Sequence, residues 1–543
     1  MKDKVLVILI VVFAALSGML GGLLLSGSRR AGSALMQEEL STLGKYDQVL
    51  HYIRSNYVDS INADSINDLT LMRLMSELDP HSAYIPAKDL DDVNTELGSS
   101  FSGIGIQFVI RRDTVHVVEV VSGGPSERAG IKAGDRIVTV DDSLFVGRTV
   151  TNERVMHTLR GKKGSTVRLG IAREGAAESL TFTITRGDIP LHAIDAAFII
   201  RPGVGMIRVS KFSETTYTEF LNALASLRNQ GARNYVIDLR ENGGGLMDQV
   251  IYMANEFLRR GQTIVYSEGR SYERFDAIAD GTGRFKNAPL AVLIDEYSAS
   301  ASEIFAGAMQ DNDRGIVVGR RSFGKGLVQQ QYELTDHSAI RLTVARYYTP
   351  SGRCIQKPYR LGEQDDYLYD LWNRYEHGEL DNRDSIRMQD STVYKTIGGR
   401  TVYGGGGIMP DVFVPRDTSR YTAWYNLVSN RSYTIDFAFQ YVDQNRARLS
   451  EYTDYQSLEQ YLLRQDLVNR FVAYADERGV EPNRQQIDKS APLLLQHLVA
   501  YIIRDALGNE AFFQIWLRDD TMVQRAIEAL QTEHLPGSVS SGL

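Results

Sequence analysis

The sequence predicts an α/β core into which a small β-domain is inserted, with helical regions towards both ends and one apolar segment near the N-terminus. Three observations predict this organisation. Short strands broken by glycine dominate residues 99–188, strand–helix–strand alternation follows from residue 189, and helical periodicity returns after about residue 417. A length of 543 residues suits several domains rather than one.

Composition excludes several classes of protein. Lys and Arg number 60 against 68 Asp and Glu, and a net charge of -8 gives no reason to expect a nucleic-acid partner. Hydrophobic residues at 43% and charged residues at 24% are ordinary for globular proteins. The single cysteine, Cys354, excludes a disulfide framework and a Cys-rich zinc site. The nine histidines show no HExxH or HxH spacing, so we expect no metal and no cofactor.

Residues Val5–Leu25 form an uncharged run of 21 residues. At a rise of about 1.5 Å per residue, such a helix just spans a hydrocarbon core of about 30 Å. A cleaved signal peptide is the alternative, but Arg29 and Arg30 stand where a small-residue cleavage site belongs. We therefore expect residues 1–30 to be a membrane anchor or signal segment, with the anchor favoured. The flanking positive charges are balanced and do not set its orientation.

The remaining elements follow in order. Residues 38–98 have the period of short helices, and residues 99–188 read as a compact β-domain of alternating strands. Residues 189–416 alternate buried strands with amphipathic helices, and the acidic stretch at about 361–393 reads as a solvated insertion. Residues 417–543 are helical, and the amphipathic helices at the two ends of the chain could join two chains in a homodimer.

One motif resembles a phosphate-binding loop. Gly319–Gly326 reads GRRSFGKG, but Gly326 stands where Ser or Thr should hold magnesium. Such a loop opens a helix, whereas apolar strand-like residues follow here. A nucleotide-dependent enzyme is therefore not favoured, and Lys325 needs another explanation.

A second site gives that explanation. Ser300 lies where the buried run AVLID gives way to a helix, so the free amides of the first helical turn would face its hydroxyl. Lys325 lies between two apolar strands, where burial would lower the pKa of its amine and make it a base near neutral pH. A serine beside a neutral lysine is a complete nucleophile and base. The alternative is that the serines of SASAS only cap and pack the helix.

Seven motifs in order resemble those of the carboxy-terminal processing (tail-specific) serine peptidases, over about residues 40–415. They are LDPHSAY at Leu78–Tyr84, SGIGIQF at Ser102–Phe108, DLRENGGG at Asp238–Gly245, SASASEIFAGAMQD at Ser298–Asp311, SFGKGLVQ at Ser322–Gln329, TPSGRCIQ at Thr349–Gln356 and GGIMPDVFV at Gly406–Val414. The resemblance implies an α/β protease core, a PDZ-like domain at 99–188 and a serine endopeptidase that cleaves protein substrates.

The resemblance also implies roles for single residues. Ser300 would be the nucleophile and Lys325 the base, and Gln329 would orient the lysine. The sequence does not decide which glycine of Gly243–Gly245 completes the oxyanion hole, and the candidate donors are the amides of Ala301, Gly243 and Gly244.

The PDZ-like domain suggests how a substrate is selected. The turn Gly103-Ile104-Gly105-Ile106 enters a strand, and its amides could hold a C-terminal carboxylate while the peptide adds to the sheet edge. Arg160 matches the arginine that couples the PDZ domain to the protease in some relatives, or it is a solvated turn residue.

The expected partners are therefore proteins or peptides with free C-termini. The resemblance implies a single-pass protein of the bacterial inner membrane whose catalytic part is periplasmic or otherwise extracytoplasmic. A non-catalytic PDZ adaptor on an inactive protease core is the alternative function, and it predicts binding of C-terminal peptides without cleavage.

Overall fold

The computed structural model describes residues 44–532, except residues 47, 51, 122, 174 and 388–391. The predicted membrane segment, Val5–Leu25, lies outside these residues. Among the residues described, no helix is long and apolar enough to cross a membrane. The chain divides into two units after Met75. The first contains most of helix α2 (Ala63–Ser76), and the second, Ser76–Leu543, contains the elements of the core, the PDZ-like domain and the C-terminal helices.

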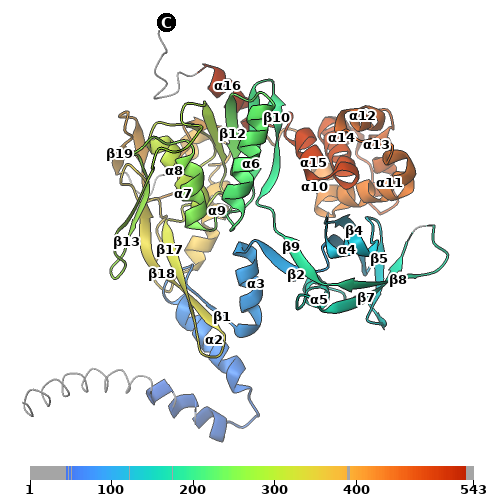
Figure 1. Ribbon diagram of the computed structural model, residues 1–543, viewed down its shortest axis with the longest axis horizontal. Coiled ribbons are helices and arrows are strands. Elements are labelled where there is room, and N and C mark those ends of the chain that lie inside the picture. The colour runs from blue at the N-terminus through green and yellow to red at the C-terminus, as the bar shows by residue number, and fades with distance from the viewer. Residues whose placement is uncertain are drawn as a thin grey trace, which may run out of the picture. The chain divides into compact units, whose positions relative to one another are not determined.

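A six-stranded sheet forms the centre of the core (Figure 1). Its order is β10-β11-β12-β15-β16-β21, and all neighbours from β11 onwards are parallel, while β10 and β11 are antiparallel. Continuous apolar runs such as LAVLI are typical of parallel strands that are buried on both faces. The strand bounds are β10 Ile194–Arg201, β11 Val204–Val209, β12 Asn234–Asp238, β15 Leu290–Ile294, β16 Ile316–Gly319 and β21 Val412–Phe413.

Helices cover both faces of this sheet. Side chains of α6 (Thr216–Asn229), α7 (Met247–Asn255) and α8 (Ala301–Asp311) share one apolar cluster with one face of the strands. The opposite face packs against α16 (Thr521–Thr532). Within the expected helical region at 417–543, α16 returns to the protease core, because its apolar face covers the strands.

A second sheet carries part of the predicted site. Its path is β1-β18-β13-β14, and β17 pairs with β18 as an antiparallel hairpin. The SFGKG motif lies in the connection between β16 and β17. A strand follows it, as the sequence predicts, whereas a phosphate-binding loop would be followed by a helix. The bounds are β1 Ala83–Ile85, β13 Thr263–Glu268, β14 Phe275–Ile278, β17 Leu327–Glu333 and β18 Ala339–Tyr348.

The PDZ-like domain has its own sheet and its own apolar cluster. The strand order is β3-β4-β5-β7-β8, with β6 beside β5, so β3 is an edge strand of the sheet as described. A separate pair, β2 with β9, joins the domain to the core. The elements are β2 Ser100–Gly103, β3 Ile106–Arg111, β4 Thr114–Val120, α4 Pro125–Ala129, β5 Arg136–Val140, β6 Ser143–Leu144, α5 Asn152–Leu159, β7 Thr166–Ala172, β8 Leu180–Thr185 and β9 Gly187–Pro190.

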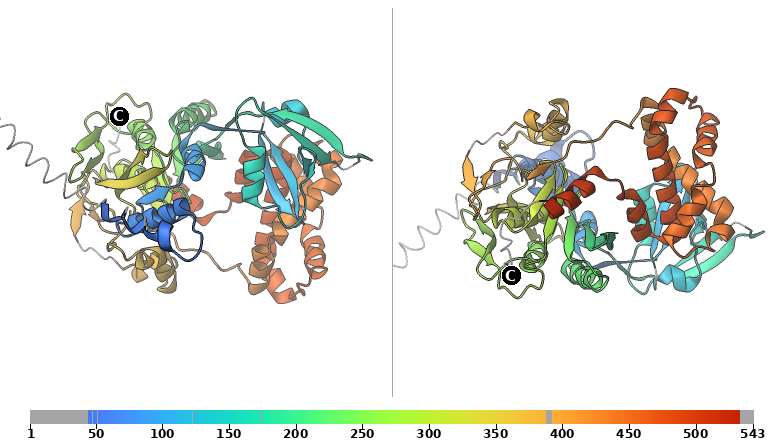
Figure 2. Two further views of the ribbon diagram at one scale, coloured as in Figure 1. Left: turned by 90° about the horizontal axis from the view of Figure 1, so that it is seen from below. Right: turned by 90° about the horizontal axis from the view of Figure 1, so that it is seen from above.

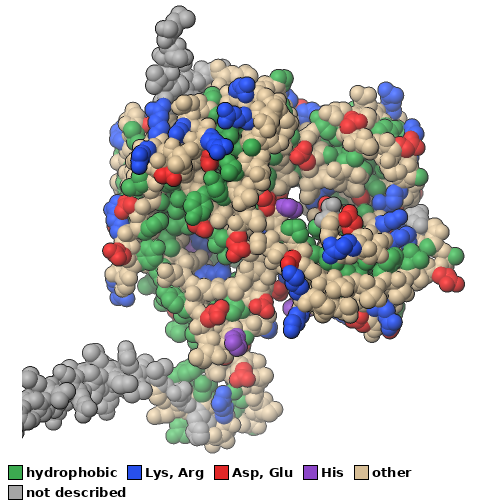
Figure 3. Space-filling view, in the orientation of Figure 1, with side chains coloured by type: hydrophobic (Ala, Val, Ile, Leu, Met, Phe, Trp, Pro, Cys, Tyr) green, Lys and Arg blue, Asp and Glu red, His purple; other side chains and the backbone are tan. Residues whose placement is uncertain are grey.

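Six helices after the core form a bundle with a core of its own, which lies beside the PDZ-like domain in both views of Figure 2. Two ion pairs join the bundle to that domain, Arg111 with Asp436 at 3.0 Å and Arg136 with Asp443 at 3.2 Å. The helices are α10 Ala423–Asn430, α11 Tyr433–Leu449, α12 Tyr455–Leu462, α13 Leu467–Asp476, α14 Arg484–Leu507 and α15 Asn509–Trp516. Acidic and basic side chains are interspersed on the face shown in Figure 3.

The acidic stretch at about 361–393 is not simply solvated, which corrects the expectation from its composition. It contains α9 (Asp365–Glu376), which buries Tyr367 and Arg374. Arg374 pairs with Glu379 at 2.8 Å and donates to the carbonyls of residues 321 and 322. The buried charge of Arg374 is therefore paired with the carboxylate of Glu379. The stretch also contains a short 3₁₀ helix, Arg383–Ser385, and β19 (Val393–Lys395), which pairs with β20 (Thr401–Tyr403).

Candidate active site

Ser300 lies at the junction of strand and helix that the sequence predicts. It precedes the first residue of α8 and has φ 55° and ψ -112°, a left-handed backbone that residues other than glycine rarely adopt. Such strain persists only where the surrounding structure holds it in place, and it is concentrated at functional sites. The side chain of Ser300 is half-buried.

Glu303 holds the backbone around Ser300 and Lys325 together. Its Oε2 accepts a hydrogen bond from the Ser300 amide and another from the Lys325 amide, each at 2.8 Å. Its Oε1 accepts from the Ser322 hydroxyl at 2.5 Å and the Gly324 amide at 2.7 Å. Burial raises the pKa of Glu303 to about 7, against the lowering effect of these four donors. Above that pH, one carboxylate therefore orders the start of α8 and the SFGKG loop at once.

Tyr347 provides a second link between the same two segments. It is buried on β18, and its hydroxyl contacts the carbonyl oxygens of Ser300, at 3.0 Å, and of Lys325. Two side chains, those of Glu303 and Tyr347, therefore each contact the backbone of both the candidate nucleophile and the candidate base.

The Lys325 amine lies in surroundings that favour its neutral form. Burial lowers its pKa from 10.5, and Arg341 lowers it further. Its Nζ donates to Oε1 of Gln329 at 3.2 Å. The amide nitrogen of Gln329 in turn donates to the carbonyl of His81 at 2.5 Å, so the glutamine is held at both ends.

The Asp79–Ser82 turn supports that arrangement. The Asp79 carboxylate accepts from the amides of His81 and Ser82 and from the Thr343 hydroxyl on β18, at 2.9, 3.0 and 3.0 Å. The His81 ring lies 2.7 Å from the Tyr367 hydroxyl, and burial, with a further effect from Lys325, lowers the pKa of His81 to about 4. With so low a pKa the ring is a weak base, and its contacts are those of a turn residue packed on Tyr367.

The glycine run after β12 lies directly against Ser300. Asn242 fixes it, since its carbonyl accepts from the Ala299 amide at 3.0 Å and from the Ser302 hydroxyl at 2.8 Å.

A Cβ on Gly244 would come within 2.7 Å of the Ser300 Cβ, so only glycine fits there. The Gly244 amide donates to the Asn242 side chain at 2.9 Å. Within the described residues, the amides of Gly243 and Ala301 have no such partner.

The turn in the PDZ-like domain precedes the edge strand β3. Gly105 has φ 77°, and the carbonyls of Ile104 and Gly105 accept from the amides of Ser126 and Val121. Gly103 ends β2, and Ile106 begins β3. The turn is thus fixed from one side and leads into a strand that an added peptide can pair with.

Arg160 is not a freely solvated turn residue. It follows α5, and its guanidinium donates to Asp92 at 2.7 Å and lies 4.6 Å from the centre of the Phe101 ring. Asp92 belongs to α3 (Ala87–Leu97), where Asn94 accepts from Gln331 of β17 at 2.9 Å. Arg160 therefore touches a helix that also contacts the hairpin bearing Gln329.

Sequence reasoning missed Glu303 and Tyr347. The spacing of Ser300 and Glu303 is the S-x-x-E pattern of a helix capping box, so the glutamate carried a readable signal. Tyr347 carried none, because its contact with Ser300 spans 47 positions.

Comparisons with known proteins match three parts of the chain to known families. A model of peptidase family S41 matches residues 203–367, a PDZ-domain model matches residues 102–184, and a family of unknown function, DUF8443, matches residues 424–508. A carboxy-terminal-processing protease of Bartonella bacilliformis is 35% identical over 328 residues, covering 59% of this chain and 74% of the relative. The carboxy-terminal processing protease CtpA of Bacillus subtilis is 32% identical over 376 residues, covering 68% and 79%.

A solved structure, the photosystem II D1 C-terminal processing protease, is 26% identical with a TM-score of 0.34, covering 67% of this chain and 85% of that one. Fold, site and matches together define a serine peptidase with a PDZ domain and a helical C-terminal region. The chain belongs to peptidase family S41, among the carboxy-terminal processing proteases. The resemblance drawn from the sequence is confirmed.

Proposed function

We propose that the protein is an endopeptidase that recognises protein C-termini through its PDZ domain and cleaves with a Ser300–Lys325 dyad. The observation that supports this best is the pair of side chains, Glu303 and Tyr347, that contact the backbone of both residues. Burial of Lys325 supplies a neutral amine at lower pH than an ordinary lysine would.

The proposed reaction has two steps. Neutral Lys325 takes the hydroxyl proton as Ser300 Oγ attacks the scissile carbonyl, while Gln329 orients the lysine. The amides of Ala301 and Gly243 stabilise the oxyanion, since both lack another acceptor within the described residues. The protonated lysine then returns its proton to the leaving amine. Water, deprotonated by Lys325, attacks the acyl-enzyme, and the lysine gives that proton to the Ser300 oxygen as the acyl group leaves.

Substrate selection is proposed to begin at the PDZ domain. The C-terminal carboxylate of a substrate would bind at Gly103–Ile106, and its last residues would add to β3 as a further strand. Arg160, through Asp92 and α3, would transmit occupancy of that groove to the hairpin with Gln329.

The test compares a loosely folded protein substrate that ends in apolar residues with the same substrate amidated at its C-terminus. Slower cleavage of the amidated form, with unchanged cleavage of a short internal peptide, supports tail recognition. Equal rates for both forms would contradict it, and binding without cleavage would favour the adaptor.

Location is a separate proposal. Residues Val5–Leu25 would anchor the chain in a bacterial inner membrane, with the catalytic part on the extracytoplasmic side. Retention of the full chain in membranes after alkaline extraction supports an anchor, and release into the supernatant contradicts it. A homodimer through the terminal helices stays a prediction.

A further inference from the structure

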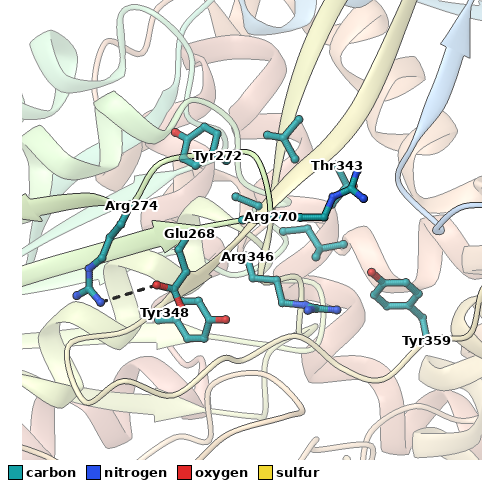
Figure 4. A pocket seen from close by; sticks show the side chains of 12 residues that line it. Glu268, Arg270, Tyr272, Arg274, Thr343, Arg346, Tyr348 and Tyr359 are labelled. Atoms are coloured by element: carbon teal, nitrogen blue, oxygen red, sulfur yellow. Dashed lines mark ion pairs between the residues drawn. The ribbon is translucent and has the colours of Figure 1, made fainter. Parts of the chain in front are cut away.

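A cavity of about 600 Å³ opens on the second sheet, beside β18 and the start of β17, the strand that carries Gln329. Figure 4 shows its lining: the loop after β13 on one side, β18 beneath, and Tyr359 at one end. Three arginines line it, Arg270, Arg274 and Arg346, against a single acidic residue, Glu268. The cavity therefore has an excess of two positive charges.

Only one of the three arginines is neutralised. Arg274 pairs with Asp276 at 2.8 Å and Glu268 at 3.9 Å, and lies 4.0 Å from the centre of the Tyr266 ring. The guanidinium groups of Arg270 and Arg346 line the cavity without a hydrogen bond or ion pair to any side chain or carbonyl within the described part of the chain. Glu268 stands opposite Arg346 in the strand register, yet Figure 4 shows its carboxylate turned to Arg274 and the Arg346 guanidinium directed toward Tyr359.

The walls are firmly built. A Cβ on Gly269 would lie 2.1 Å from the Val344 carbonyl oxygen, so the loop that bears Arg270 rests directly on β18. Tyr348 stacks on Tyr266 with ring centres 4.9 Å apart. Two guanidinium groups over half-buried aromatic walls suit a carboxylate, which each can bind through paired N–H donors.

The cavity shares a sheet face with the group that orients the base. Leu327 pairs with Arg346 and Gln329 with Thr343. Leu327 and Gln329 are alternate residues of β17 and share a face, and each directly paired residue of β18 lies on the same face as its partner. An irregularity in the pairing at Val344 keeps Arg346 and Thr343 on this face although they are three positions apart. Leu327, which lines the cavity and begins β17, is two residues beyond Lys325, so the chain separates them by at most about 7 Å. A peptide at the proposed catalytic site would pass within reach of this cavity.

We infer that the cavity lined by Arg270 and Arg346 is a substrate subsite that binds a peptide carboxylate within a few residues of the cleaved bond. The inference rests on the proposed function. The carboxylate has two sources, an Asp or Glu side chain and the terminus of a short leaving segment, and both have the chemistry that the arginines recognise.

The test is a series of fluorogenic peptides in which one Asp moves position by position across the cleaved bond, each with an Asn counterpart. We expect one position, or two alternate ones, where Asp raises kcat/KM by about three- to tenfold over Asn, with the preference shrinking as salt increases. Arg346→Gln and Arg270→Gln should each reduce it, and Arg346→Glu should prefer Lys to Asp. Arg228→Gln, an exposed arginine on α6, is the matched control and should leave it unchanged.

Amidated versions of each peptide separate the two sources of carboxylate. A preference that survives amidation assigns the site to a side chain, and one that is lost on amidation assigns it to a terminus. Equal rates for Asp and Asn peptides at every position, with normal cleavage, would overturn the inference while leaving the proposed function intact.

A binding assay keeps the two proposals separate if no peptide is cleaved. The Ser300→Ala variant is titrated with labelled Asp and Asn peptides by fluorescence anisotropy. Tighter binding of an Asp peptide that Arg346→Glu abolishes supports the subsite even without turnover. Identical affinities in all variants would sink it.

Discussion

The backbone amides of Ser300 and Lys325, 25 positions apart in the sequence, donate to one carboxylate oxygen, Oε2 of Glu303, each at 2.8 Å. A single side chain thus sets the spacing between the proposed nucleophile and the proposed base. Because a misplacement of about 1 Å can cost about a hundredfold in rate, that spacing is what the site most needs to keep.

Glu303→Gln should lower kcat about a hundredfold. The variant replaces one carboxylate oxygen, which accepts hydrogen bonds, with an NH₂ group, which can only donate and would face N–H donors. Steady-state kinetics on a peptide substrate measures the loss, and circular dichroism checks that the variant is folded. Glu273→Gln, on the exposed loop after β13, is the control and should be unchanged. Full activity in Glu303→Gln would remove the glutamate from the account.

The pH profile should report both buried groups. Because the Glu303 pKa is about 7, its protonation below that pH removes acceptor capacity from four donors, so kcat/KM should fall as the pH drops through 7. Activity should rise further as Lys325 loses its proton, at a pKa below the usual 10.5. An activity that is flat from pH 5 to neutral would contradict this assignment.

Lys325→Met should change how stability depends on pH. Between the lowered folded pKa and 10.5, the unfolded chain binds more protons at Lys325 than the folded chain, so the free energy of unfolding of the wild type increases with pH there. Methionine removes that contribution, and the variant should be the more stable protein at neutral pH, since no buried amine must lose its hydration. Urea unfolding of both proteins from neutral to alkaline pH tests the sign. Parallel curves would indicate an unperturbed lysine.

Two neighbouring glycines should respond very differently to alanine. Gly244 has φ 105° and no room for a Cβ beside Ser300, so Gly244→Ala should displace the nucleophile and abolish most activity. Gly243 has open space at that position and keeps its amide as alanine, so Gly243→Ala should retain activity within a fewfold. Equal losses in the two variants would argue that the run acts only as a flexible loop.

Arg160 should matter for coupling and not for chemistry. Arg160→Ala should weaken the stimulation of peptide cleavage by a second, PDZ-binding C-terminal peptide, while cleavage without that peptide stays unchanged. Asp92→Asn should behave alike, and the double variant should be no worse than either single one, as expected for partners in one contact. Arg154→Ala, on α5 but bonded to Thr149, is the control. Additive effects would place Arg160 and Asp92 in separate roles.

Much of the site could be predicted because its signals are local. Single motifs contain these signals: a buried apolar run before Ser300, small residues around it, and glycines on both sides of Lys325. They locate β15, α8 and the connection to β17. Glu303 was also within reach, since a helix that begins with Ser and has Glu three residues later predicts a capping box.

Other features depend on contacts that the sequence does not encode locally. Tyr347, on β18, reaches Ser300 across 47 positions, and His81 reaches Gln329 across 248 positions. The acidic stretch looked solvated because its charges dominate its composition, yet Arg374 is buried by pairing with Glu379. The return of α16 to the core could not be predicted, because the apolar face that packs there is one that any amphipathic helix shows.

The central claim is that Ser300 and Lys325 act together as nucleophile and base. The most direct measurement compares cleavage of one peptide by residues 36–543 of the wild type, Ser300→Ala and Lys325→Ala, with a serine-directed fluorophosphonate probe as a second readout. If the two residues act together, neither variant turns the peptide over and only the wild type is labelled, at a rate that rises with pH. Turnover or labelling that persists without Lys325 would contradict it.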